Sequence, residues 1–144
     1  MRVKIPLQIT EIDPGNYHII ISGSFADNKT ASWIIDTGAS KTVFDKNLVE
    51  YYSILEGETD EIHTAGIEDQ PQEISLAVLK SMQIGKFKIE NLKVALLDLT
   101  HINKLYSKIT DLKICGFIGS DFLMENRAII DYKKRVLILN NSRY

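Results

Sequence analysis

The spacing of apolar residues predicts a chain built mainly of β-strands. Over Val3–Ile9 every second residue is apolar, which is typical of a strand with one buried face. Tyr17–Phe25 is rich in β-branched residues, Asp27–Asn28 offers turn chemistry, and Ser32–Ile35 is again apolar. This order predicts a hairpin whose second strand is buried and ends at Asp36.

The rest of the chain predicts more strands and a few short helices. We expect one helix over Asn47–Tyr52 with Asp45 as its N-cap, and one over Leu99–Ile109 with Thr100 as its cap. Residues 119–121 open a third helix, Phe122–Asn126. The further expected strands are Glu58–Thr64, Glu73–Val78, Met82–Ile84, Phe87–Leu97, Ala128–Tyr132 and Arg135–Leu139. No low-complexity linker divides the chain, so we expect one mostly-β domain over residues 1–144.

Composition and charge narrow the class of protein. With 144 residues, of which 44% are hydrophobic and 25% charged, the chain can bury a core without metals or disulfides. A net charge of −2 without a basic stripe argues against a nucleic-acid partner. The N-terminus lacks the apolar core of a signal peptide, and no window is apolar enough for a membrane span. We therefore expect a cytoplasmic protein.

Cysteine and histidine do not suggest a metal or redox site. Cys115, the single cysteine, lies in an apolar run and is expected to be a small buried hydrophobe. The histidines show no spacing typical of zinc ligands, and His63 is interpreted as a strand residue facing solvent. Trp33 is expected in the core. We expect no metal and no organic cofactor.

The candidate chemistry lies in residues 34–39, Ile-Ile-Asp-Thr-Gly-Ala, where a carboxylate follows a buried strand. In one interpretation this segment is only a turn, in which Asp36 accepts backbone N–H bonds and Gly38 supplies conformational freedom. In the other, Asp36 is catalytic. Two facing carboxylates within about 3 Å cannot both ionise, so they share a proton and supply one base and one acid at once.

The second carboxylate of such a pair is missing from the sequence. Asp98, Asp121 and Asp131 lie near apolar residues, but none is followed by Thr-Gly or Ser-Gly. A twofold axis between the Asp36 side chains of two copies would supply it, and twofold dimers are the commonest oligomers. In this hypothesis Gly38 lends an N–H to the carboxylate, and Thr37 bonds across to the partner loop.

These residues, followed about eighty positions later by Phe117-Ile118-Gly119-Ser120-Asp121, resemble the retropepsin-like aspartic protease family. The resemblance covers roughly residues 17–139 and implies a closed acid-protease β-barrel with a flap hairpin. It also implies an aspartic endopeptidase acting on peptides or proteins as a homodimer. The implied site residues are catalytic Asp36, Thr37 and Gly38, substrate-binding Ala39, Thr64, Ala65, Gly66 and Ile67 (the last four at the flap tip), and supporting Ile118 and Gly119.

The chain departs from retroviral members of that family at Ser40 and Ser120, where those members carry an Asp and an Arg that form an ion pair near the dimer interface. In them the chain termini also interleave in a dimer sheet, and whether Val3–Ile9 or Val136–Leu139 does so here is open. Two other hypotheses remain: a non-catalytic peptide-binding or dimerisation module on the same fold, and an unrelated β-barrel carrier of small ligands.

Overall fold

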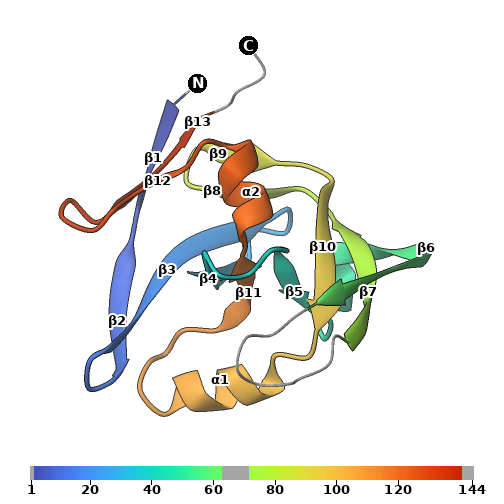
Figure 1. Ribbon diagram of the computed structural model, residues 1–144, viewed down its shortest axis with the longest axis horizontal. Helices are drawn as coiled ribbons and strands as arrows, with labels where there is room; N and C mark the ends of the chain where they lie inside the picture. The colour runs from blue at the N-terminus through green and yellow to red at the C-terminus, as the bar shows by residue number, and fades with distance from the viewer. Residues whose placement is uncertain (1, 63–71, 141–144) are drawn as a thin grey trace.

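The computed structural model describes residues 2–62 and 72–140, with side chains left out at 58–62, 72 and 73. Strands predominate (Figure 1). The strands are β1 (Arg2–Pro6), β2 (Gln8–Asp13), β3 (Asn16–Phe25), β4 (Thr30–Ile35), β5 (Val43–Asp45), β6 (Tyr52–Ile62), β7 (Gln72–Leu79), β8 (Met82–Ile84), β9 (Phe87–Ile89), β10 (Leu92–Leu97), β11 (Ile114–Ile118), β12 (Ile129–Asp131) and β13 (Val136–Asn140). The helices are α1 (Thr100–Ser107), α2 (Ser120–Glu125) and the 3-10 turn η1 (Val49–Tyr51).

The larger sheet curls into a half-barrel (Figure 1). Its strand order is β6-β7-β10-β5-β11-β4-β3-β8-β9, and β2 pairs with β3 beside this path. The expected mostly-β architecture is confirmed in this form. The pairs between described strands do not join β6 to β9, so closure into a barrel remains an expectation.

The smaller sheet brings the two ends of the chain together. Its order is β1-β13-β12, with β1 antiparallel to β13 from the pair Arg2–Asn140 to the pair Pro6–Val136. β12 runs antiparallel along the other side of β13. The two terminal segments considered for a dimer sheet therefore pair with each other inside one chain.

The core consists of two clusters on the two faces of the large sheet. The first contains Trp33 and Phe44, both fully buried, together with Ile35 and residues of β1 and β13. The second contains Ile34 and the fully buried Tyr106, so it fixes α1 against the sheet. Because neighbouring residues of β4 enter different clusters, both faces of this strand are covered. The prediction that Trp33 is a core residue is confirmed.

Some predicted boundaries were wrong. The expected strand Val3–Ile9 is two strands that divide at the buried Leu7, whose N–H donates to the Arg135 carbonyl at 2.9 Å. The expected strand Phe87–Leu97 is interrupted at Asn91, which has a left-handed backbone with φ of 56°. At Leu7 the apolar alternation continues through the break between strands, whereas at Asn91 it shifts by one residue.

Two predicted helix starts were also wrong. Asp45 ends β5 instead of capping a helix, and only the short turn η1 forms within Asn47–Tyr52. Asp45 Oδ1 accepts the N–H of Asn47 at 3.1 Å and that of Leu99 at 3.3 Å. At α1 the carboxylate of Asp98, and not Thr100, accepts the first free N–H.

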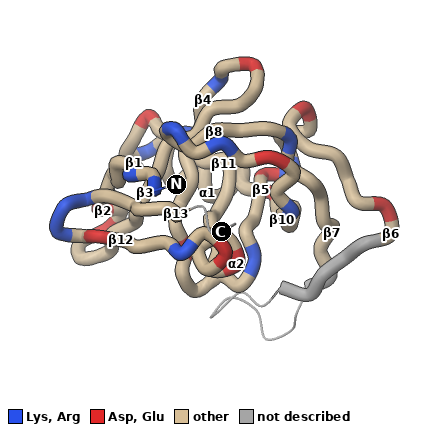
Figure 2. Tube along the Cα trace, turned by 90° about the horizontal axis from the view of Figure 1, so that it is seen from above, with Lys and Arg blue, Asp and Glu red and all other residues tan. Residues whose placement is uncertain are grey.

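Acidic and basic residues are interspersed along the described trace (Figure 2). No helix in the described ranges is long and apolar enough to cross a membrane.

Candidate active site

The loop that carries Asp36 connects two strands lying on either side of β11. β4 runs parallel to β11, with Ile35 beside Ile118, and β5 runs antiparallel to it, with Val43 beside Phe117. The connection therefore passes over the end of β11. The Asp36 N–H donates to the Ile118 carbonyl at 2.9 Å, which extends the β4–β11 ladder to the carboxylate residue itself.

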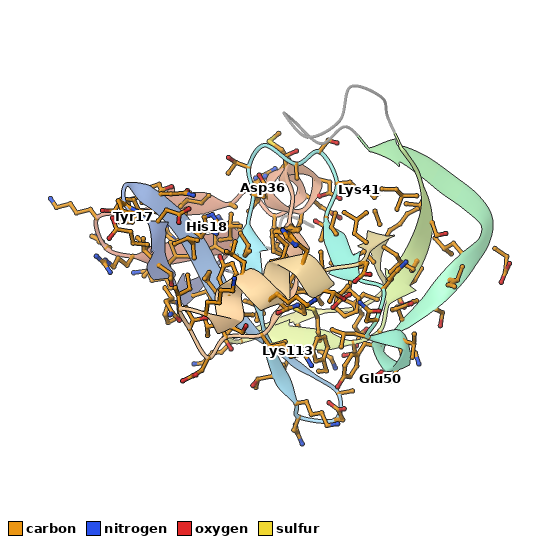
Figure 3. The ribbon with its side chains drawn as sticks, turned by 90° about the horizontal axis from the view of Figure 1, so that it is seen from below. Tyr17, His18, Asp36, Lys41, Glu50 and Lys113 are labelled. Atoms are coloured by element: carbon orange, nitrogen blue, oxygen red, sulfur yellow. The ribbon has the colours of Figure 1, made fainter. Side chains whose placement is uncertain are left out.

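The Asp36 side chain is exposed and held from one side only. Its Oδ1 accepts the Gly38 N–H at 3.1 Å, and the Asp36 carbonyl accepts the Ala39 N–H at 3.1 Å. Asp36 and Gly38 are exposed and Ala39 is half-buried. Within the described residues Oδ2 has no hydrogen-bond partner, so this oxygen is free for a ligand (Figure 3).

A buried hydroxyl fastens the far end of the loop. Thr42 is fully buried, and its Oγ1 donates to Asp121 Oδ1 at 2.8 Å while accepting the Gly119 N–H at 3.1 Å. The same Asp121 oxygen accepts the N–H groups of Thr42 and Phe122. One carboxylate therefore joins the Asp36 loop to the start of α2, where the Ser120 N–H also donates to the Ala39 carbonyl at 2.8 Å.

Two glycines allow β11 to approach this loop closely. A Cβ on Gly119 would lie 2.7 Å from the Lys41 carbonyl carbon, and one on Gly116 would lie 2.2 Å from the Val43 carbonyl oxygen. Real Cβ atoms do not make such contacts with backbone, so only glycine fits at either position. Gly119 lies against the Asp36 loop, and Ile118 is fully buried beside it, while their supporting role stays a prediction.

Residues 19–122 match the family model described as aspartyl protease, which covers more than half of the chain. The chain belongs to this family. The aspartyl protease fold is also found among solved structures. A retropepsin-like aspartic protease from Rickettsia conorii has a TM-score of 0.52 and 20% identity over 96% of this chain and 89% of that chain. The crystal structure of edgp has a TM-score of 0.59 and 10% identity over 99% of this chain and 46% of that chain. No curated protein matches the sequence.

The hairpin at the position of the predicted flap is formed by β6 and β7 of this aspartyl protease chain. Its strands pair antiparallel as far as Ile62 and Gln72, with a shift of register between Ile54 and Thr59. The predicted tip residues Thr64, Ala65, Gly66 and Ile67, and the neighbouring His63, lie outside the described residues.

Sequence reasoning missed Thr42 and gave Asp121 no role. The two residues are 79 positions apart, and the sequence placed Asp121 at the opening of a helix without indicating its contact with Thr42. The one available signal was that a carboxylate directly follows the Gly-Ser turn. In this structure the position lies at the start of α2, where free N–H groups need an acceptor.

Other ionisable side chains show no catalytic arrangement. Cys115 is 0% exposed, and burial raises the pKa of its thiol well above the ordinary value, as expected of an inert core residue. Within the described part of the chain no three His, Cys, Asp or Glu side chains gather in a way that would hold a metal ion.

Proposed function

We propose that this chain is an aspartic endopeptidase that hydrolyses peptide bonds with the Asp36 carboxylates of two copies. The observation that carries the proposal is the state of Asp36, which is exposed at the end of a buried strand with Oδ2 unbonded. The loop around it is tied to β11 and α2 by backbone bonds and by the buried Thr42. A site built in this way holds a carboxylate rigidly while leaving it open to substrate.

The other aspartates considered as partners have structural roles in the same chain. Asp98 accepts the Thr100 N–H at the start of α1, Asp121 joins Thr42 to α2, and Asp131 accepts the Lys134 N–H in the β12–β13 turn. Each of these carboxylates therefore makes its hydrogen bonds to groups other than Asp36. This supports a second copy as the source of the other catalytic carboxylate.

In the proposed reaction the pair shares one proton. The ionised carboxylate takes a proton from a water molecule, whose oxygen attacks the peptide carbonyl carbon. The protonated carboxyl donates its proton to the carbonyl oxygen, which gives a tetrahedral diol. As the carbon–nitrogen bond breaks, the first carboxyl gives the proton that it took from water to the leaving nitrogen, and the other takes its own proton back from a diol hydroxyl. Gly38 supplies its N–H to Asp36, Thr37 bonds to the partner loop, and Ala39 with Thr64, Ala65, Gly66 and Ile67 contacts the peptide.

We also propose how the two copies meet. β13 is paired on both sides within its own chain, which leaves β1 and β12 as the outer strands of the small sheet. β1 carries the exposed Lys4 and Pro6, and both residue types protect a sheet edge. β12 instead carries Ile129, which is 49% exposed. Tyr132, which directly follows β12, is 62% exposed. A dimer through the β12 edge needs no interleaved termini.

Closure of the half-barrel belongs to the same proposal. The β6–β7 hairpin would fold over a bound peptide as a flap, complete the barrel and exclude water from the reacting bond.

The test is cleavage of a diverse peptide library from pH 3.5 to 8 by wild type, Asp36→Asn and Asp13→Asn. Asp13 is an exposed aspartate at the end of β2 and serves as the matched control. We expect cuts that disappear only in Asp36→Asn and that are faster on the acid side of neutral. A rate that stays flat across this pH range would contradict the shared proton. Peptide binding that survives Asp36→Ala, without any cleavage, would instead favour the binding module.

A further inference from the structure

His18 of β3 makes a close polar contact with the helix α1. Its Nδ1 lies 2.5 Å from the Tyr106 hydroxyl, and the two ring centres are 5.8 Å apart. Tyr106 is fully buried, and this burial raises the pKa of its hydroxyl to about 12. The hydroxyl therefore keeps its proton at any pH at which the protein would work.

The direction of this hydrogen bond follows from the surroundings of Tyr106. A buried O–H needs an acceptor, and within the described residues His18 Nδ1 is the partner that Tyr106 has. The hydroxyl therefore donates, Nδ1 accepts, and the proton of the neutral imidazole is on Nε2. Nε2 has no hydrogen-bond partner in the described ranges, and the side chain is only half-buried.

The pairing register of β3 and β4 places His18 beside the Asp36 loop. Ile19 pairs with Ile35, so the next position along the β3–β4 ladder sets His18 opposite Asp36. Paired residues in such a ladder are about 4.5–5.5 Å apart between Cα atoms. Figure 3 shows His18 and Asp36 above α1, on neighbouring strand ends.

The two side chains also share a face of the sheet. Ile20 and Ile34, each two residues away from one of them along its strand, both enter the cluster that contains Tyr106. Alternation along a strand then directs His18 and Asp36 to that same face. The remaining strand neighbour of His18 is Thr10 of β2, which is uncharged.

We propose that His18 determines substrate specificity by donating Nε2–H to an acidic side chain of a peptide bound beside Asp36, and that Tyr106 is the residue that positions it. The inference rests on the proposed function, because it assigns a substrate preference to the same Asp36 site. A carboxylate fits better than an apolar side chain because it accepts the bond from either form of the imidazole and is attracted to the charged form.

The first test uses pairs of peptides that are cleaved at the same bond and differ only in Glu or Leu at one position near it. A hydrogen bond to a charged group corresponds to about a tenfold to hundredfold preference in kcat/KM. We expect His18→Asn to remove this preference, because Asn keeps a polar atom near the Tyr106 hydroxyl but does not reach the Nε2 position. His101→Asn, at an exposed position of α1, is the matched control and should change nothing.

The second test observes the ring nitrogens of His18 by ¹⁵N NMR in the free protein, where catalysis has no part. We expect the Nε2–H tautomer in wild type and a mixture of tautomers in Tyr106→Phe, which should also weaken the Glu preference. An Nδ1–H tautomer, or a Glu preference that is unchanged in His18→Asn, would overturn the inference and leave the protease proposal standing. Absence of any Asp36-dependent cleavage in the wild type would overturn both.

Discussion

The Thr42 hydroxyl, at the scale of single residues, connects the Asp36 loop to the rest of the molecule. It makes hydrogen bonds to Asp121 and Gly119 with no access to water. Thr42→Val leaves both partners without this bond, and we expect the free energy of unfolding to fall by about 1–3 kcal/mol. Urea denaturation measures the loss. Thr42→Ser retains the hydroxyl and should lose clearly less, and equal losses in the two variants would show that the methyl group contributes as much as the hydroxyl.

The glycines of the site give a second prediction at this scale. In Gly116→Ala the new methyl meets both the Val43 carbonyl and the Trp33 ring, at 2.2 and 2.5 Å. Relieving these clashes requires neighbouring strands to move apart, so we expect the free energy of unfolding to fall by about 3 kcal/mol or more. Gly23→Ala is the comparison, because its methyl would meet only the Trp33 side chain, at 3.1 Å, and the Gln83 carbonyl oxygen, at 3.4 Å. Thermal unfolding should give a clearly lower midpoint for Gly116→Ala, and the reverse order would refute the packing argument.

At the scale of elements, Asp98 makes the start of α1 sensitive to acid. Hydrogen bonds from the Thr100 hydroxyl and N–H, and then from Asn47, lower the pKa of Asp98 to about 2. A lowered pKa stabilises the fold above the ordinary value near 3.8, and this contribution is lost as the pH falls through about 2.

The prediction compares wild type with Asp98→Asn by thermal unfolding from pH 7 to pH 2. The variant should be less stable by a constant amount above about pH 5, and the difference should shrink towards pH 2. Asp111→Asn, at an exposed loop position, should show no such trend. A difference in stability between wild type and Asp98→Asn that persists at pH 2 would show that the shape of the side chain, and not its charge, causes the effect.

The same elements show what sequence can and cannot predict. The β3–β4 hairpin and the position of Asp36 were predictable because alternation and turn chemistry are local signals. The absence of the helix expected after Asp45 was not predictable, because Asp45 bonds to Leu99, which lies 54 positions away. The Thr42–Asp121 bond joins segments that become neighbours only when β11 enters between β4 and β5. Local pattern thus predicted the strand that carries the carboxylate, and tertiary contacts determined what holds it.

At the scale of the whole molecule, the proposed dimer through the β12 edge gives a prediction about self-association. Ile129→Lys places a charge on the apolar edge, so we expect self-association to weaken at least about tenfold in sedimentation experiments. Ile109→Lys is the matched control, since Ile109 is 48% exposed, close to the 49% of Ile129, but follows α1. Equal weakening by both substitutions would argue against the β12 edge. Asp36→Asn should associate like wild type, which separates assembly from catalysis.

The small sheet also sets an order of events during synthesis. β1 pairs over residues 2–6 with residues 136–140 of β13, so β1 has no partner until the segment that carries β13 has been made. Contacts between such distant segments form late because a very long loop must close before they stabilise anything. β12 pairs only with β13, so the edge proposed for dimerisation is completed at the same late stage. A nascent chain would therefore carry the Asp36 loop before the proposed β12 edge exists, and in the proposed dimer peptide cleavage would begin only after β13 had joined the small sheet.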